Sequence, residues 1–456
     1  MQAHRVTIIG GGGVRTPLLI HGLAQAKEAL PIHDVSLFDR DQDRAEAIAR
    51  LGREIVHRLG AEFEIHVRKS LEAALGGADF VVNCIRVGGM EGRARDERLV
   101  IERGLAGQET TGPGGAAMAL RTIPVTLAHA RKVEQVAPQA WFINFTNPAG
   151  VITQALTQNT NLRTIGICDT PAELFFGIAR ALGGPPADCQ FDYAGLNHLG
   201  WVRSVRLRGA DVTTRILDDP ELLRRCYPAG LFDPELIRTL RLIPTEYLFF
   251  YYSQRRAHEN QLRAGASRGE ELAKLNRELF RQLPYQTPAQ ALDTYRAYLA
   301  QRNASYLKLE TEGGSAFDFA SDPGDPFNAA TGYHRIAVDV ITGLVSDQPR
   351  EIVLNVPNRG AIDDLKAEDV VEVPCDLDRS GPRPRPTGGL PEAVRGLVQS
   401  VKEYERTLLR AALSGSAALA QMAMMQCPIV GDWELAGGLT QALIAQDPVN
   451  LGYLRF

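Results

Sequence analysis

A thiol, a carboxyl and an imidazole stand where metal chemistry and proton transfer can meet. Cys168 and Asp169 follow the apolar run 164–167, which is typical of a buried strand, and Pro171 then breaks the pattern. His198 lies in the following segment. A thiolate and an imidazole suit a divalent metal, and a carboxyl can transfer protons. The alternative is that Cys168 is a small buried hydrophobic side chain, the commoner role of such a cysteine.

The chain opens with a glycine-rich turn between a strand-like run and a helical pattern. Residues 5–9 are apolar, glycines fill positions 10–13, and Thr16-Pro17 predicts a helix start with Thr16 as its N-cap. This order suits a dinucleotide, whose pyrophosphate lies on a helix N-terminus beside glycine backbone. The match is partial, because Arg15 stands where the third glycine of the standard spacing is expected.

Asp39 supports the same interpretation from the end of the next strand-like run, 35–38. A carboxylate there suits the two hydroxyls of an adenosine ribose and repels a 2′-phosphate, which favours NAD over NADP, while Arg40 weakens that preference. A metal beside a nicotinamide indicates an enzyme that makes a ketone and uses the acidity of the neighbouring carbon. A glycine turn that binds no nucleotide is the alternative.

Three further segments carry side chains suited to a ligand. Arginines follow the apolar run 79–85, and their forked guanidinium groups suit an oxyanion. The alternative is that they lie on a solvated helix face and pair with acidic side chains. The glycine-rich stretch 107–115 predicts a tightly turned loop of the kind found at ligand sites. Asn147 follows a strand-like run and can either bind a sugar hydroxyl or form a turn.

The stretch 244–252 is rich in aromatic residues, which is typical of a core. A tyrosine in it can act as a base only where a metal or an arginine brings its pKa well below about 10. These considerations leave open which of Tyr247, Tyr251 and Tyr252 would do so.

Strand-like runs alternate with helical patterns until about residue 190, and these elements position the polar groups above. The runs are 5–9, 35–38, 63–67, 79–85, 140–145 and 164–167. The alternation predicts an α/β fold with a Rossmann-type, doubly wound parallel sheet, as in lactate and malate dehydrogenases. Ligands collect at the carboxyl ends of such strands. We assign residues 1–190 to an NAD-binding domain.

Residues 191–456 form a second, α+β domain in this interpretation, which carries substrate, metal and oligomer contacts. Its predicted strands are 191–196, 201–207, 351–356 and 370–373. Its predicted helical regions are 235–312 and 390–446, with loops at 313–332 and 376–389.

Composition narrows the class of protein. The 456 residues are 45% hydrophobic and 23% charged, with a net charge of −4, so nothing points to a nucleic acid or a membrane surface as partner. The six cysteines form no Cys-x-x-Cys pair, which favours a reduced, cytoplasmic protein. The N-terminal residues lack the apolar core of a signal peptide, and no uncharged stretch approaches about 18 residues, so no membrane span is expected.

Motifs across nearly the whole chain resemble glycoside hydrolase family 4, and they occur in the family's order. This family holds NAD- and manganese-dependent glycosidases, including 6-phospho-β-glucosidases and 6-phospho-α-glucosidases. The motifs are Val-Thr-Ile-Ile-Gly-Gly-Gly at 6–12, Arg-Val-Gly-Gly at 86–89, Gly-Gln-Glu-Thr-Thr-Gly-Pro-Gly-Gly at 107–115, Thr-Asn-Pro at 146–148, Cys-Asp-Thr-Pro at 168–171, Gly-Leu-Asn-His at 195–198 and Glu-Val-Pro-Cys at 372–375.

The resemblance implies a role for individual residues. By it, Cys168 and His198 are the metal ligands, Asp169 is the general acid at the leaving group, and Tyr247 is the base. The residues implied to hold NAD are Gly10, Gly12, Gly13 and Asp39, and those implied to contact the substrate are Arg93, Asn147 and Arg268.

The resemblance also implies a mechanism. NAD+ takes hydride from C3 of the sugar, and Mn2+ polarises the resulting ketone. Tyr247 removes the C2 proton, the C1 oxygen leaves by elimination, water adds, and hydride returns to C3. The cofactor is thus regenerated in each turnover, and such enzymes are exceptions to two-carboxylate glycoside hydrolysis.

The implied substrate is a small glycoside that is anionic at C6, first of all a 6-phospho-β-glucoside, and the implied assembly is a homo-oligomer of two or four chains. By the same resemblance, Asp169 matches the members specific for α-glucosides, because members specific for β-glucosides often carry Asn at that position. The rest of the chain is closer to the β-specific members. The stretch 313–340 departs from phospho-glucosidases, which keeps an NAD-dependent sulfoquinovosidase open. A 2-hydroxy acid dehydrogenase is the more distant rival, and Cys168 with His198 counts against it.

Overall fold

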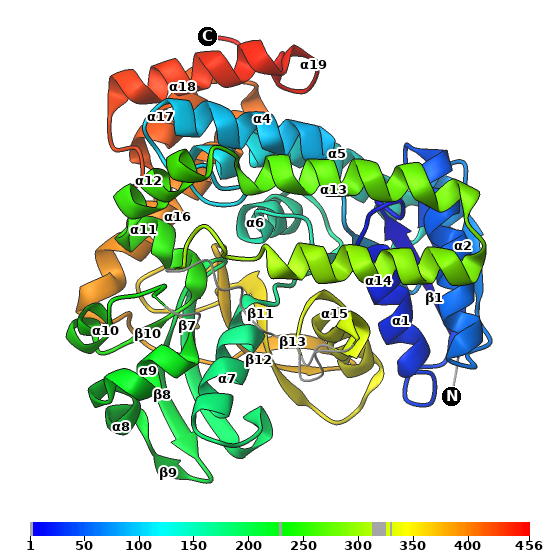
Figure 1. Cartoon of the computed structure of the whole chain (residues 1–456), viewed down its shortest axis with the longest axis horizontal. Helices are drawn as coiled ribbons and strands as arrows, with labels where there is room; N and C mark the ends of the chain where they lie inside the picture. The colour runs from blue at the N-terminus through cyan, green and yellow to red at the C-terminus, as the bar shows by residue number, and fades with distance from the viewer. Residues whose placement is uncertain (1–2, 228–229, 312–324, 329–330) are drawn as a thin grey trace.

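The computed structural model describes residues 3–227, 230–311, 325–328 and 331–456 (Figure 1). Most of the loop predicted at 313–332 therefore lies outside the described residues. Within them, no helix is long and apolar enough to span a membrane.

One sheet runs through both halves of the described chain, in the order β10-β8-β7-β12-β11-β6-β5-β4-β1-β2-β3. Two short strands lie off this path, β9 beside β8 and β13 beside β12. The strands are β1 His4–Ile9, β2 Ile32–Phe38, β3 Glu64–Val67, β4 Phe80–Asn83, β5 Trp141–Asn144, β6 Arg163–Gly166, β7 Cys189–Leu196, β8 Leu199–Leu207, β9 Ala210–Asp211, β10 Ile243–Pro244, β11 Arg350–Pro357, β12 Val370–Asp378 and β13 Gly381–Pro384.

The strands β1 to β6 are parallel and confirm the predicted doubly wound sheet. Neighbours pair in register from β3 through β2, β1, β4 and β5 to β6, for example Ile8 with Leu37 and Val82 with Ile143. Their side chains are buried on both faces, as expected for a parallel sheet that helices cover on both sides. All six carboxyl ends therefore meet at one edge.

The other strands are antiparallel and continue the same sheet. Asn355 of β11 pairs with Gly166 of β6, which joins the two halves. The prediction of a surface loop at 376–389 is wrong in part, because β12 extends to Asp378 and β13 pairs back onto it. Gly381, with φ of +103°, allows the turn, and β13 pairs only with β12, where prolines are tolerated.

Helices cover the sheet on both faces. In the second half most of them fall in the predicted regions 235–312 and 390–446, but the helices at 213–218, 220–226 and 333–345 lie outside these regions. The helices are α1 Thr16–Gln25, α2 Gln42–Arg58, α3 Leu71–Leu75, α4 Gly89–Glu102, α5 Gly112–Val136, α6 Ala149–Asn159, α7 Thr170–Ala181, α8 Thr213–Asp218, α9 Pro220–Cys226, α10 Pro234–Leu240, α11 Phe249–Tyr252, α12 Gln254–Ala264, α13 Arg268–Gln282, α14 Pro288–Ala304, α15 Tyr333–Val345, α16 Glu392–Ser414, α17 Ala417–Gln426, α18 Trp433–Gln446 and α19 Pro448–Leu451.

Two helix starts near the sheet edge differ in how they are capped. The N-cap of α1 is Arg15 and not the predicted Thr16, which is the first helical residue, and its side chain makes no cap. At the start of α13, Ser267 and Glu270 form the reciprocal hydrogen bonds of a capping box, which fixes the helix to begin at Arg268.

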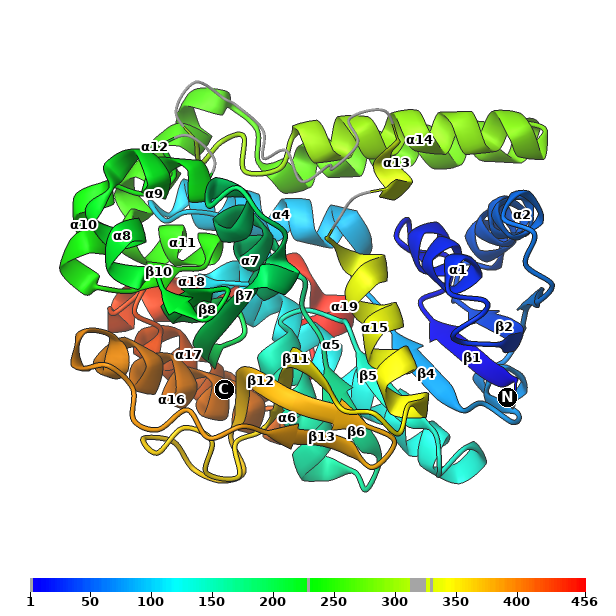
Figure 2. The same ribbon diagram turned by 90° about the horizontal axis from the view of Figure 1, so that it is seen from below.

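The helices α13 and α14 lie side by side and pass over the edge where the parallel strands end (Figure 2). α13 packs on α4, and α14 packs on α2, while α15 packs along α1. These contacts bring residues from the second half of the chain over the glycine-rich turn of the first half. The elements that were predicted to carry chemistry thus meet in space.

Candidate active site

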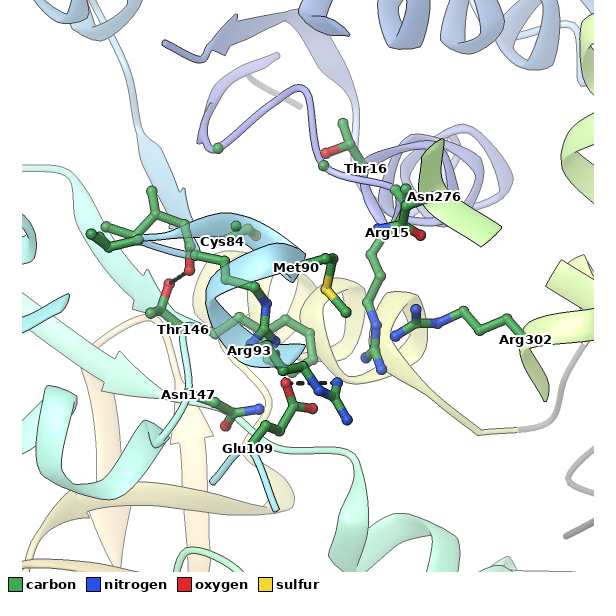
Figure 3. Close-up of a pocket in the computed structure, with 18 of the residues that line it drawn as sticks. Arg15, Thr16, Cys84, Met90, Arg93, Glu109, Thr146, Asn147, Asn276 and Arg302 are labelled. Carbon is green, nitrogen blue, oxygen red and sulfur yellow. Dashed lines mark hydrogen bonds and ion pairs between the residues drawn. The ribbon is translucent and has the colours of Figure 1, made fainter. Parts of the chain in front are cut away.

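A cavity of about 1130 Å³ lies at the carboxyl ends of the parallel strands (Figure 3). All the residues to which the resemblance assigns a role line it. They are Gly10, Gly12, Gly13, Asp39, Arg93, Asn147, Cys168, Asp169, His198, Tyr247 and Arg268. Of the three tyrosines that the sequence left open, Tyr247 lines it and Tyr251 and Tyr252 do not; Tyr306, from the second half of the chain, also lines it.

The glycine turn forms one end of the cavity. Gly10 has φ of +87°, and a Cβ at this position would stand 2.9 Å from the backbone of Cys84, so only glycine fits. The Gly12 N–H donates to Asp39 Oδ2 at 3.0 Å, and the Asp41 N–H donates to Asp39 Oδ1 at 3.0 Å. Each oxygen of Asp39 has a second lone pair, so the carboxylate is held in place and can still accept from ribose hydroxyls.

Cys168 and Asp169 lie between β6 and α7, as predicted. Burial, together with Glu372 and Asp169, raises the pKa of the Cys168 thiol well above its ordinary value. Asp169 is the N-cap residue of α7, but its side chain makes no capping hydrogen bond. Its carboxylate instead lies 3.7 Å from the Arg15 guanidinium across the cavity. It is therefore placed to meet a ligand.

His198 sits in the turn between β7 and β8 with φ of 61°, a left-handed conformation that is uncommon for residues other than glycine. Its Nδ1 is hydrogen-bonded to Thr110 Oγ1 at 3.0 Å, and its ring stacks on Tyr247 with centroids 3.9 Å apart. Burial lowers its pKa to about 4, so the imidazole is neutral at physiological pH. A neutral imidazole with one nitrogen already fixed is the form in which histidine binds a metal.

This donor set fits a divalent metal in its chemistry. The thiol of Cys168 and the imidazole of His198 line the same cavity, and a bound cation deprotonates a coordinating thiol. In the described part of the chain, no group of three or more His, Cys, Asp or Glu side chains is placed to hold an ion. A metal at this pair would therefore take its remaining ligands from water or substrate.

The turn that carries His198 is anchored by a buried carboxylate that sequence reasoning missed. Asn197 Nδ2 donates to Glu372 Oε1 at 3.2 Å, and the Tyr193 hydroxyl donates to Glu372 Oε2 at 2.7 Å. Asn355 of β11 donates to the same carboxylate at 2.9 Å. Glu372 belongs to the Glu-Val-Pro-Cys motif, which was the one available signal for it.

Tyr247 lies in a buried, acidic part of the cavity. Burial, followed by Glu109 and Glu246, raises its pKa well above the ordinary value. Glu246 accepts hydrogen bonds from the Thr170 hydroxyl at 3.1 Å and the Tyr306 hydroxyl at 3.2 Å, and burial raises its pKa to about 7. These side chains alone thus keep the phenol protonated, and its use as a base requires positive charge nearby.

Arg93 is a buried cation whose charge is balanced by two glutamates. Its Nε lies 2.7 Å from Glu97 Oε1, and its Nη1 lies 2.8 Å from Glu109 Oε2. Glu109 also pairs with Arg86 at 2.5 Å, and although burial acts to raise its pKa, these two arginines hold it well below the ordinary value. Arg93 therefore does not lie on the solvated helix face that was the alternative.

Arg268 and Arg302 face the cavity from the two helices above it. Arg268 donates to the backbone carbonyl of Ser305 and stacks on Tyr306 at 4.9 Å. Arg302 extends from the last turn of α14 toward Arg15, so that the two guanidinium groups point at each other (Figure 3). Glu310, a buried carboxyl that lines the same cavity, acts electrostatically on Arg268. Sequence reasoning missed Arg302, because nothing distinguishes it from other arginines in a helical segment.

Comparisons with known protein families agree across both halves of the chain. The model described as family 4 glycosyl hydrolase matches residues 5–183. The model of the C-terminal domain of that family matches residues 193–430.

Similar proteins include both β- and α-specific enzymes. The chain is 32% identical over 437 residues to a probable 6-phospho-β-glucosidase of Bacillus subtilis, which covers 93% of this chain and 92% of that protein. It is 26% identical over 475 residues to a phospho-α-glucosidase of Clostridium acetobutylicum, which covers 99% of each protein.

Solved structures agree with the observed fold. The 6-phospho-β-glucosidase of Thermotoga maritima, solved with manganese, NAD+ and glucose 6-phosphate, has a TM-score of 0.82 and 26% identity, covering 99% of this chain and 100% of that chain. Malate dehydrogenase of Cryptosporidium parvum has a TM-score of 0.53 at 14% identity, covering 91% of this chain and 100% of that chain. This second likeness concerns the fold alone and confirms the predicted dehydrogenase-like architecture.

Proposed function

Because this chain belongs to family 4 of the glycosyl hydrolases, we propose that it hydrolyses a 6-phospho-β-glucoside with NAD+ and a divalent metal, first of all Mn2+. The observation that carries the proposal is one cavity lined by both the glycine turn with Asp39 and the pair Cys168 and His198. A dehydrogenase fold alone would account for the glycine turn with Asp39 but not for Cys168 and His198.

The β preference is supported by the pattern of relatives. Two proteins named as 6-phospho-β-glucosidases, from Bacillus subtilis and Escherichia coli, are 32% and 30% identical to this chain, against 26% for the phospho-α-glucosidase. The Thermotoga maritima structure with glucose 6-phosphate supports a phosphorylated sugar.

The residues of the two cofactor sites act by binding and orienting. The glycine turn and the start of α1 receive a pyrophosphate, and Asp39 accepts from the adenosine ribose. Cys168 and His198, which line the same cavity, would hold the metal. When bound, NAD+ supplies a hydride acceptor for C3 of the sugar, and the metal supplies a Lewis acid for the neighbouring oxygens.

Tyr247 and Asp169 move the protons. Oxidation at C3 makes the C2 proton acidic, and Tyr247 accepts it. Because the rings of His198 and Tyr247 stack at 3.9 Å, positive charge bound at His198 also acts on the phenol and lowers its pKa. Asp169 donates a proton to the departing C1 oxygen, and the elimination product then takes up water and the returning hydride.

Arg268 and Arg302 bind the anionic group at C6 in this account. Both line the cavity, and the carboxyl that acts on Arg268, Glu310, has its pKa raised to about 7 by burial, so the two guanidinium groups can bind an oxyanion. Burial, followed by Arg302 and Arg93, lowers the pKa of Arg268 to about 10, which an anion would reverse. Arg93 and Asn147 then contact the neutral sugar oxygens, since the charge of Arg93 is met by two glutamates.

The test is hydrolysis of nitrophenyl glucosides by protein freed of nucleotide and metal. We expect activity only when NAD+ and Mn2+ are both added back, and at least tenfold faster cleavage of the β-glucoside 6-phosphate than of the neutral β-glucoside. Undiminished activity without either cofactor contradicts the proposed chemistry. A preference for the α-anomer or for a 6-sulfonate contradicts the proposed substrate.

A further inference from the structure

The glycine-rich stretch 107–115 was predicted to form a loop at a ligand site, and the proposed function gives Gln108 and Thr110 in it no role. Gln108 lines the cavity, and Thr110 Oγ1 is hydrogen-bonded to His198 Nδ1 at 3.0 Å. Both side chains are buried, each with an exposed fraction of 8%. The loop thus contacts one of the two proposed metal ligands.

The backbone of this loop is fixed from two sides. The side chain of Gln261 on α12 accepts from the Gly107 N–H and donates to the Gly107 carbonyl, both at 2.8 Å. On the other side, a Cβ at Gly114 would collide with the backbone carbonyl of Gln108, so only glycine lets α5 begin this close to the loop. Thr110 therefore stands on backbone with little freedom to move.

The side-chain oxygen of Gln108 is fixed by two backbone donors. The Thr110 N–H donates to Gln108 Oε1 at 2.5 Å, and the Thr111 N–H donates to it at 2.8 Å. An NH2 group in this place would face two other donors, so the amide has one favourable orientation. The Thr110 hydroxyl lies 2.9 Å from the same oxygen. Because an amide oxygen carries no hydrogen, the hydroxyl supplies the one between them and donates to Gln108.

This hydrogen bond determines which atom supplies the hydrogen between Thr110 and His198. A hydroxyl carries a single hydrogen, and Thr110 directs its own toward Gln108. The 3.0 Å contact between Thr110 Oγ1 and His198 Nδ1 therefore requires a hydrogen on Nδ1. A metal-binding imidazole is neutral and carries one N–H, so a hydrogen on Nδ1 leaves the lone pair of Nε2 for the metal.

We propose that Thr110, oriented by Gln108, is a positioning residue that keeps His198 in the Nδ1–H tautomer and so presents Nε2 to the metal. The inference rests on the proposed function for the identity of the metal site. It adds which nitrogen of His198 binds and which side chain decides this. Without the Thr110 hydroxyl the ring can take either tautomer, and a ring with its hydrogen on Nε2 cannot bind a metal through that atom.

The first test is calorimetric titration of the full-length chain with Mn2+. Thr110→Val removes the hydroxyl and keeps a side chain of similar shape. We expect it to bind Mn2+ about 10- to 100-fold more weakly than the parent, the usual effect of removing such a partner of a metal ligand. Thr110→Ser keeps the hydroxyl and should restore binding to nearly that of the parent.

Thr111→Val is the matched control. Thr111 is the next residue of the same buried loop, and its hydroxyl is hydrogen-bonded to the same Gln108 oxygen at 3.3 Å, whereas the hydrogen bond to His198 comes from Thr110. This variant should bind Mn2+ as the parent does. All the variants should keep the parent's affinity for NAD+, since the glycine turn and Asp39 are unchanged, and this excludes a general loss of structure.

The second test reads the tautomer itself, by nitrogen-15 NMR of the metal-free chain labelled at histidine. The signals of His198 are identified by their absence from the spectrum of His198→Gln. We expect a protonated Nδ1 and an unprotonated Nε2 in the parent, in Thr110→Ser and in Thr111→Val. Thr110→Val should show a mixture of the two tautomers, a change that the loss of packing alone would not produce.

Two results would overturn the inference while the proposed function stands. One is a metal-free parent with its His198 hydrogen on Nε2, and the other is a parent and a Thr110→Val variant that bind Mn2+ equally well. A parent that shows the Nδ1–H tautomer but binds no Mn2+, with or without NAD+, would instead overturn the proposed function. The two failures are therefore distinguishable.

Discussion

The reactivity of Tyr247 depends on the charge that binds beside it. Its phenol is buried near Glu109 and Glu246, which raises its pKa and makes it a poor base by itself. The same phenol stacks on His198, one of the two proposed metal ligands. In the proposed function, proton abstraction would therefore be coupled to metal binding, because a bound cation would lower the pKa of the phenol.

Replacing Tyr247 with phenylalanine removes the proposed base and little else. We expect exchange of the C2 proton with solvent deuterium to fall by about 100- to 10,000-fold, the usual contribution of a general base. Tyr251→Phe is the control, since that tyrosine is half-buried and does not line the cavity. Parental exchange by Tyr247→Phe would place the base elsewhere.

Replacing Cys168 with serine should weaken Mn2+ binding, because serine stays protonated at neutral pH whereas a metal-bound thiol does not. We expect a loss of at least tenfold in calorimetric titration. Cys189→Ser, at a half-buried cysteine outside the cavity, should titrate like the parent. Identical titration of all three proteins would refute the ligand assignment.

The sequence located the residues with distinctive chemistry and missed those whose role comes from packing. Cys168 and His198 stand out because a thiol and an imidazole at strand ends are unusual. Glu109 and Arg302 do not stand out, because their importance arises from partners far along the chain. Only the folded arrangement shows that Arg93 is neutralised and that Arg302 lines the cavity.

A buried carboxylate, Glu97, connects helix α4 to helix α13, which passes over the cavity. Glu97 is 1% exposed, and its Oε1 accepts from Arg93 at 2.7 Å while its Oε2 accepts from the Gly269 N–H of α13 at 2.7 Å. Gly269 has no room for a side chain, since a Cβ would stand 2.7 Å from that oxygen. This contact sets the position of Arg268 over the site.

Glu97→Gln should therefore destabilise the protein strongly. Buried Arg93 keeps Glu109 but loses one of its two carboxylate partners, and Gly269 keeps only part of its hydrogen bond, so the loss should be about 1.5–3 kcal/mol. Glu91→Gln on the same helix removes an exposed pair with Arg277 and should change the unfolding free energy by less than about 1 kcal/mol. Chemical denaturation of both variants measures the difference, and equal effects would contradict this role for Glu97.

The elements with clear periodicity were predicted well, and those set by pairing were not. The alternating strands and amphipathic helices such as α2 could be predicted from the local sequence. The apolar residues that recur with the helix or strand periodicity are also the residues buried in the core. β13 was missed because its sequence, Gly-Pro-Arg-Pro, has no strand pattern and is held only by the hydrogen bonds of β12. The N-cap of α1 was misplaced by one residue, since Thr16 lies inside the helix.

The two halves of the chain share one sheet and one hydrophobic core among the described residues. The connection between β11 and β12 is tied to α16 by an ion pair, in which Arg406 Nε donates to Asp369 Oδ1 at 2.8 Å. Although burial acts to raise it, hydrogen bonds from Arg406 hold the pKa of Asp369 below its ordinary value. The contribution of this pair to stability thus depends on pH.

Stability should fall as acid protonates Asp369. A carboxyl whose pKa is lowered by folding contributes fully above its unfolded pKa of about 3.9, and the contribution is lost as pH falls through its folded pKa. Asp369→Asn should lower the unfolding free energy by about 1–3 kcal/mol at pH 7 and by less near pH 3. Asp363→Asn, at an exposed position nearby, is the control. A deficit that is the same at both pH values would exclude this origin.

The central claim, hydrolysis through transient oxidation and C2 deprotonation, is tested most directly by cleaving a nitrophenyl β-glucoside 6-phosphate in deuterated water with NAD+ and Mn2+. The account predicts that the glucose 6-phosphate formed carries deuterium at C2. It also predicts that nitrophenol released exceeds the NAD+ supplied while no NADH accumulates. A product without deuterium at C2, formed equally fast without NAD+, would contradict the account.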